Sequence, residues 1–214
     1  MTDMQEFRYA VSRRAAGGHA GPDGRDGLDG PACDLAVLLG VRTAVLLEGA
    51  SDLAAVEALA ARRGRDLAAE GVCVVSMGGA MSVGRYAGLL GPTGLGLRLT
   101  GLCDERERPF FDRGLARAGA ERGDVFVCVA DLEEELIRAL GAPKVEEIVQ
   151  AEGDLRAWQT FMRQPAHHGR PARQQLRRFL GTKKGRKIRY GRLLVEALDH
   201  DQVPAPLDGL LASL

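Results

Sequence analysis

Four short apolar runs, each followed by a helical pattern, constrain the fold of this chain more than any other feature of its sequence. The runs cover residues 43–47, 72–77, 97–103 and 125–130. They are apolar throughout rather than at alternate positions, which is typical of strands that are buried on both faces. The stretches that follow them carry apolar residues at helical spacing. The chain is therefore predicted to have an α/β fold with a mostly parallel, four-stranded sheet flanked by helices.

The segments outside these alternating elements suggest the domain organisation. Residues 1–34 are rich in glycine and are predicted to form a flexible tail. The main domain is predicted over residues 35–200, with basic C-terminal helices over about 143–200. Residues 201–214 include two prolines and are predicted to be a loose C-terminal end.

Three of the four apolar runs are followed directly by an acidic residue. These residues are Glu48, Asp104 and Asp131, and Asp52 and Glu133 follow closely. Because the carboxyl ends of parallel strands lie on one edge of a sheet, these side chains are expected to gather there. Helix capping accounts for Asp131 or Asp52 taken alone, but a strand-ending Glu before a glycine caps poorly. Crowded carboxylates repel one another unless a cation neutralises them, and oxygen ligands favour Mg²⁺ or Mn²⁺.

Charge is unevenly distributed along the chain although the formal net charge is zero. Residues 156–192 contain twelve Lys or Arg and no acid, whereas residues 102–152 contain thirteen acids and seven bases. Solvated helix faces are one explanation, and a polyanion-binding surface beside a cation site is the other. Lys and Arg that neutralise phosphates release counterions when they bind a nucleic-acid backbone. The candidate nucleic-acid-binding residues are Arg177, Arg178, Lys183, Lys184, Arg186, Lys187 and Arg189.

The cysteines and the apolar runs bear on the compartment. Four cysteines stand at positions 33, 73, 103 and 128, without a CxxC pair, and three lie inside apolar runs. Neither a zinc site nor a disulfide framework is expected from this pattern. The sequence shows no signal peptide, and no run approaches the roughly 20 apolar residues of a membrane span. A cytoplasmic protein without a membrane segment is predicted.

These residues, taken in order, resemble a TOPRIM domain. The resemblance rests on TAVLLEGASD at 43–52, the helix after it, the Gly78–Gly79 turn and the strand ending LCD at 102–104. TOPRIM domains occur in topoisomerases, bacterial primases, recombination-repair proteins and overcoming-lysogenization-defect (OLD) nucleases. ADLEEELIRALG at 130–141 and the late Lys-rich segment resemble the OLD branch most closely. The usual Asp-x-Asp pair is broken by Arg106, so Glu105 or Glu107 would have to replace its second member.

The resemblance implies a metal-dependent endonuclease that cleaves DNA phosphodiester bonds with two Mg²⁺ or Mn²⁺ ions. The implied metal ligands are Glu48, Asp52, Asp104, Asp131 and Glu133. Glu48 would bridge the ions or act as general base. Lys187 would stabilise the charge that develops on the phosphate, with Lys183 and Lys184 as rivals for this role.

Other functions are compatible with the same residues. One is a catalytically weak nucleic-acid-binding TOPRIM module that serves as partner subunit of a separate ATPase. OLD nucleases carry an ATPase domain, and no GxxxxGK[ST] motif occurs in the sequence, so ATP hydrolysis would come from another polypeptide. Arg106 favours this alternative, whereas the retained acids favour the nuclease. A phosphate-transferring enzyme could also use the acidic edge.

Overall fold

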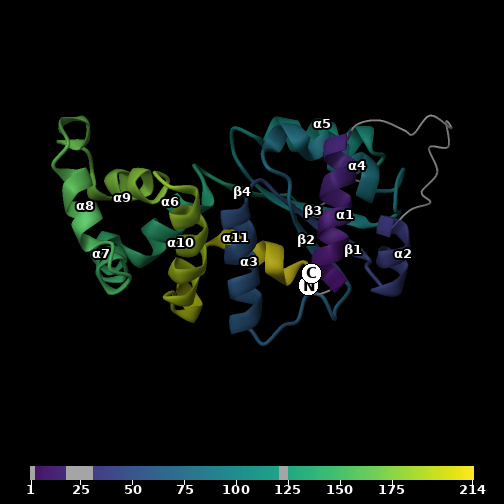
Figure 1. Cartoon of the computed structure of the whole chain (residues 1–214), viewed down its shortest axis with the longest axis horizontal. Helices are drawn as coiled ribbons and strands as arrows, with labels where there is room; N and C mark the ends of the chain where they lie inside the picture. The colour runs from purple at the N-terminus through teal and green to yellow at the C-terminus, as the bar shows by residue number, and fades with distance from the viewer. Residues whose placement is uncertain (1–2, 18–30, 121–124) are drawn as a thin grey trace.

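A single parallel sheet organises the structure, a computed structural model that describes residues 3–17, 31–120 and 125–214 (Figure 1). Its strands are β1 (Thr43–Leu47), β2 (Val72–Ser76), β3 (Arg98–Asp104) and β4 (Val125–Cys128). They lie in the order β2-β1-β3-β4, and all three neighbouring pairs are parallel. The α/β fold with a four-stranded parallel sheet predicted from the sequence is confirmed.

The central strand β1 shows why these strands are apolar throughout. Successive side chains of a strand point to opposite faces of the sheet. Val45 and Leu47 accordingly belong to the hydrophobic core on one face, and Ala44 and Leu46 to the core on the other. Helices cover both cores, so no position of β1 after Thr43 faces water.

One face of the sheet is covered by α1 (Asp3–Gly17), α2 (Pro31–Leu38), α4 (Val83–Leu90) and α5 (Arg108–Arg117) (Figure 1). The helix α1 corrects the predicted flexible tail over residues 1–34. Met4, Phe7, Val11 and Ala15 recur at helical spacing and are buried. They pack on the sheet face with residues of α4, so this part of the chain is ordered by the core. The glycines at 18–30 that suggested a tail lie outside the described residues.

The other face carries α3 (Ala50–Arg62), and the C-terminal helices extend the same hydrophobic core beyond α3, away from the sheet. These are α6 (Leu132–Leu140), α7 (Ala142–Ala151), α8 (Leu155–Met162), α9 (Ala172–Leu180) and α10 (Lys184–Glu196). The elongated molecule in Figure 1 has α6 to α10 grouped at one end and the sheet at the other. The longest helix of this group, α10, packs along α3 and so joins the helical end to the sheet. The described residues also form three short 3₁₀ turns, at Ala80–Ser82 (η1), Pro165–His167 (η2) and His200–Gln202 (η3).

The last residues form α11 (Ala205–Ala212), which corrects the predicted loose C-terminal end over 201–214. Leu207, Leu210 and Leu211 are buried, and the helix packs against β3 and β4. Pro206 stands in the first turn of α11, where proline favours a helix because no intrahelical N–H bond is lost there. Within the described residues, no helix is both long and apolar enough to cross a membrane.

Candidate metal centre

The turn between β1 and α3 holds the first two acidic residues. Glu48 follows the last residue of β1, and Gly49 N–H donates a 2.8 Å hydrogen bond to Asp52 Oδ2. The Asp52 carboxylate thereby closes the first turn of α3 and also benefits from the positive end of the helix dipole. The Glu48 carbonyl accepts a 3.0 Å bond from Gly79 N–H, in the Gly-Gly turn after β2. The turn after β2 thus helps to fix the backbone at Glu48.

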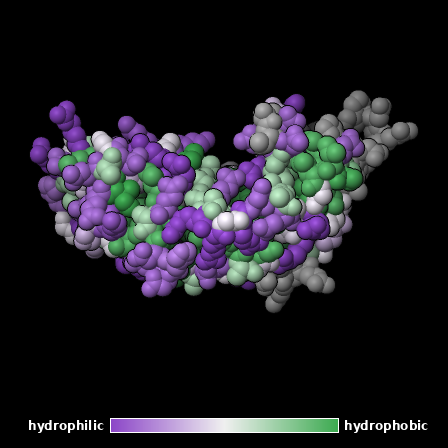
Figure 2. All heavy atoms as spheres, turned by 90° about the horizontal axis from the view of Figure 1, so that it is seen from below, coloured by the Kyte–Doolittle hydropathy of each residue, from purple (hydrophilic) through white to green (hydrophobic). Residues whose placement is uncertain are grey.

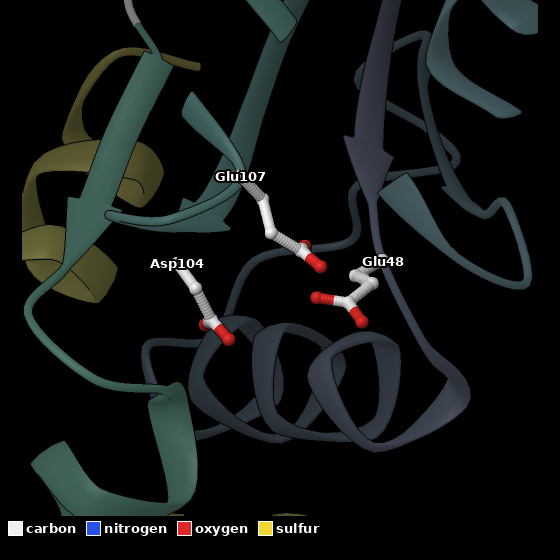
Figure 3. A group of neighbouring side chains, drawn as sticks. All are labelled: Glu48, Asp104 and Glu107. Carbon is white, nitrogen blue, oxygen red and sulfur yellow. The ribbon is translucent and has the colours of Figure 1, made fainter. Parts of the chain in front are cut away.

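The turn after β3 supplies the next two. Asp104 ends β3, and Glu107 N–H bonds back to the Asp104 carbonyl at 2.9 Å. This turn brings Glu107 over the sheet edge. Glu48, Asp104 and Glu107 each place a carboxylate oxygen so that all three oxygens lie within 4.8 Å of one another (Figure 3). No other group of three potential ligands in the described part of the chain meets this distance. Arg106, which breaks the Asp-x-Asp pair, is exposed.

Burial and mutual repulsion disfavour the charged form of these carboxylates. Burial raises the pKa of Glu48 to about 7, and its contact with Glu107 adds to the effect. Burial also raises the pKa of Asp104 to about 7, with Glu48 and Asp131 contributing next. The pKa of Asp52 rises to about 7 for the same first reason, followed by the charge of Glu133. Glu48, Asp104 and Asp52 therefore resist ionisation. A divalent cation bound beside them would stabilise their charged forms.

Glu48, Asp104 and Glu107, the three-carboxylate group, offer ligands that suit a hard cation. Glu107 Oε2 is buried and receives no hydrogen bond, so one oxygen of the group has an unfilled coordination capacity. Carboxylate oxygens are the ligands of Mg²⁺ and Mn²⁺, whereas zinc would favour thiolate or imidazole. Cys103 and Cys128 are buried nearby in the strands, and burial raises the thiol pKa of Cys103 to about 12. Neither thiol is a ligand in this arrangement.

Asp131 and Glu133, the other two predicted ligands, stand at the start of α6 and are engaged differently. Asp131 caps the helix, since its Oδ1 accepts a 2.8 Å bond from Glu134 N–H. Its Oδ2 accepts a 2.5 Å bond from Arg177 Nε. Glu133 is buried, and its Oε1 lies 3.2 Å from Lys187 Nζ. Both acids are close enough to affect the pKa of the three-carboxylate group, but neither belongs to it.

Lys187 reaches the acidic edge because α10 lies unusually close to α3. A Cβ atom built on Gly191 would stand 2.6 Å from the Ser51 carbonyl oxygen, so only glycine permits this approach. Lys187 lies one turn before Gly191. Burial lowers the pKa of Lys187. The negative charges of Glu133 and Asp52 raise this pKa by more, so the net shift is upward. Lys187 therefore stays protonated beside Asp52 and Glu133 at neutral pH.

The predicted nucleic-acid-binding residues differ in their availability. Arg178, Lys183 and Lys184 are exposed. Arg186 is buried: its Nη1 donates a 2.7 Å bond to Thr182, and its guanidinium lies 4.1 Å from the centre of the Phe179 ring. Arg189 pairs with Asp154, and Arg177 pairs with Asp131. Figure 2 shows hydrophilic side chains over much of the helical end of the molecule.

Comparison with known proteins adds to this geometry. Residues 41–105 match the family model described as "Overcoming lysogenization defect protein-like, TOPRIM domain". This segment of the chain is similar to an OLD-like TOPRIM domain. It contains Glu48, Asp52 and Asp104, and its last residue precedes Glu107 by two positions. Among curated proteins, none matches the chain.

The similarity to solved structures of OLD proteins extends beyond residues 41–105 and covers most of the chain. The C-terminal region of the Xanthomonas campestris pv. campestris OLD protein is 25% identical, with a TM-score of 0.61. The match covers 82% of this chain and 92% of that chain. The C-terminal region of the Burkholderia pseudomallei OLD protein shares the fold at 22% identity and a TM-score of 0.58, covering 81% and 96%. The resemblance to OLD proteins predicted from the sequence is confirmed.

These findings also show where the sequence interpretation was incomplete. A TOPRIM domain of this type, with its acidic cluster, is consistent with a metal-dependent function related to nucleic acids. The sequence placed Glu48 and Asp104 at strand ends, where the structure brings them together. It offered Glu105 and Glu107 equally as substitutes at the broken pair. Glu105 is exposed, and Glu107, at the N-cap position before α5, joins the group.

Proposed function

We propose that this protein is a metal-dependent endonuclease that hydrolyses DNA phosphodiester bonds at the acidic sheet edge. One observation supports the proposal above all others: Glu48, Asp104 and Glu107 place three carboxylate oxygens within 4.8 Å of one another. Three carboxylates this close repel one another when ionised, and a bound divalent cation would offset that repulsion. The match of residues 41–105 to the OLD-like TOPRIM family model also supports the proposal.

Glu48, Asp104 and Glu107 would hold a first Mg²⁺ or Mn²⁺ ion, and the two-ion form of the proposal assigns a second ion to Asp131 and Glu133, beside Asp52. Bound there, such ions acidify a water molecule and stabilise charge on the attacking and leaving oxygens. Glu48 is assigned either to bridge the two ions or to act as general base.

The basic side chains have a separate task in this proposal. Lys187, which is kept protonated by its acidic neighbours, is assigned to the negative charge that develops on the phosphate. Arg178, Lys183 and Lys184 are exposed and are assigned to phosphates of the DNA backbone. No sequence-reading element is required, because phosphate contacts position a duplex without distinguishing its bases.

Nicking of supercoiled plasmid in the presence of Mn²⁺ or Mg²⁺ tests the proposal. The wild-type protein should nick the plasmid, EDTA should prevent it, and Glu48→Gln should lower the rate by at least about 100-fold. Glu147→Gln is the matched control, since Glu147 is exposed on α7 and pairs only with Lys144 in the described part of the chain. Equal nicking by wild type and Glu48→Gln would refute the assignment.

The alternative, a nucleic-acid-binding TOPRIM subunit that acts with a separate ATPase, is favoured by Arg106 at the broken acidic pair. Gel-shift measurements on the same proteins separate the two functions. A protein that retards DNA with and without metal, yet never nicks it, acts as the binding subunit. Adding candidate ATPase partners to the nicking assay then shows whether a partner restores cleavage.

A further inference from the structure

Asp131 is engaged by protein donors at both of its carboxylate oxygens. Its Oδ1 accepts the 2.8 Å capping bond from Glu134 N–H, and its Oδ2 accepts the 2.5 Å bond from Arg177 Nε. The capping bond holds one oxygen to the start of α6 whether or not a cation is present. The remaining oxygen, Oδ2, is the one that a cation would need. In this structure Arg177 occupies it.

Glu133 differs from Asp131 because its Oε1 is ion-paired but accepts no hydrogen bond. Its residue is only 4% exposed, and no hydrogen bond of good geometry reaches Oε1. Lys187 Nζ lies 3.2 Å from this oxygen and balances its charge as an ion pair. A buried carboxylate oxygen without a hydrogen bond is costly in a protein interior and is a ready cation ligand. It lies in the same acidic edge as Asp52, whose pKa it raises.

The two basic residues that balance these acids also face solvent. The side chain of Arg177 is 45% exposed and that of Lys187 is 44% exposed. Exposed guanidinium and ammonium groups can exchange a carboxylate partner for a phosphate, and a guanidinium binds phosphate through two donors. A DNA backbone laid along α9 would therefore compete with Asp131 for Arg177.

We propose that Arg177 takes the place of the second cation in the free protein, and that a nucleic-acid phosphate admits this cation by drawing Arg177 away from Asp131. The free protein then binds one divalent ion, at Glu48, Asp104 and Glu107. The second ion binds once Asp131 Oδ2 is released. This inference rests on the proposed function, because it concerns how the same acidic edge acquires its second ion.

The coupling follows from electrostatics and is reciprocal. Arg177 and a divalent cation at Asp131 Oδ2 would repel each other, so each weakens binding of the other. DNA that removes Arg177 must strengthen second-ion binding, and the second ion must strengthen DNA binding by the same factor. Only protein that holds DNA would then bind both of the ions that cleavage requires.

Counting Mn²⁺ ions by calorimetric titration tests the inference without an activity measurement. Wild-type protein should bind one ion tightly. Arg177→Gln should bind two, with second-ion affinity increased by about 10-fold or more. Arg177→Lys keeps a cation at the position and should stay at one ion. Arg173→Gln is the matched control on the same helix, because Arg173 pairs with Glu134 rather than with Asp131.

A second measurement uses a short DNA duplex with phosphorothioate linkages, checked on a gel to remain uncut. Addition of this duplex to Mn²⁺-loaded wild type should produce the paramagnetic resonance signal of a coupled Mn²⁺ pair. Two tight ions in free wild type would overturn the inference, as would one ion in Arg177→Gln with no coupled pair on DNA. Circular dichroism confirms that each variant is folded. The proposed function fails separately, if Glu48→Gln retains the first ion at wild-type affinity.

Discussion

Two acidic sites in this structure differ in how their charge is balanced. At the sheet edge, Glu48, Asp104 and Glu107 approach one another with no basic side chain in the group, and the pKa of Glu48 and of Asp104 is raised to about 7. At the helical end, the single carboxylate of Asp154 gathers Arg186, Arg189 and Tyr190 of α10.

The second site lowers the pKa of its acid. Burial raises the pKa of Asp154, but the hydrogen bonds and charge of Arg186 outweigh burial, and the net shift is downward. Asp154 stands before α8 without capping it, so its partners all belong to α10. A charge that is balanced by its neighbours stabilises the fold, whereas a group of unbalanced charges has to be balanced by something that binds. The comparison thus separates a structural acid from candidate ligands.

The largest expected effect is on stability at the structural site. Asp154→Ala leaves the buried guanidinium of Arg186, whose side chain is 7% exposed, without its anion. Breaking such a pair should lower the free energy of unfolding by about 3 kcal/mol, measured by urea denaturation. Asp208→Ala is the control, because the Arg63–Asp208 pair is exposed and should contribute less than about 1 kcal/mol. Similar losses in both variants would remove the distinction between the two sites.

A smaller effect of opposite sign is expected at the sheet edge. The pKa of Glu48 is about 7 in the folded protein and 4.5 in the unfolded reference. The folded state therefore binds more protons, and metal-free wild type loses stability as pH rises from about 4.5 to 7. Glu48→Gln does not titrate. With allowance for solvent screening, it should be more stable than metal-free wild type by about 1 kcal/mol at pH 8, and equally stable near pH 4.

Thermal unfolding followed at both pH values measures this difference. Mg²⁺ should reverse it, because an ion that binds only the folded wild type stabilises it by mass action. A Glu48→Gln protein that is less stable than metal-free wild type at pH 8 would show that Glu48 is a structural acid like Asp154. The predicted pattern is a gain in stability with a loss of nicking, as is common for functional residues.

Local patterns predicted most of the fold and part of the site. A buried parallel strand needs an apolar run, and a strand end needs a turn, so Glu48 and Asp104 could be placed at one edge from the sequence. Glu107 could not be separated from Glu105, because its position depends on the turn that begins α5. The helix α1 was missed although Met4, Phe7 and Val11 have helical spacing, since the neighbouring glycines dominated the interpretation.

Local sequence patterns could not predict which charged side chains pair with one another. Arg186 and Lys184 are two residues apart and look alike in the sequence, but one is buried against Asp154 and the other is exposed. The difference comes from the contact between α10 and residue 154, which is 32 positions away from Arg186. Likewise, Arg177 was predicted to bind DNA, and only the structure reveals its bond to Asp131.

The smallest expected effect concerns the exposed bases. Lys183→Ala with Lys184→Ala should weaken DNA binding by about 10-fold or less at moderate salt. The slope of log affinity against log salt should fall by about 1 for each phosphate that the variant no longer neutralises. Lys144→Ala removes an exposed lysine of α7 that pairs with Glu147 and should leave the slope unchanged. An unchanged slope in the double variant would move the DNA path away from the start of α10. Binding would then depend on Arg177 and Lys187, which lie at the acidic edge beside Asp131 and Glu133.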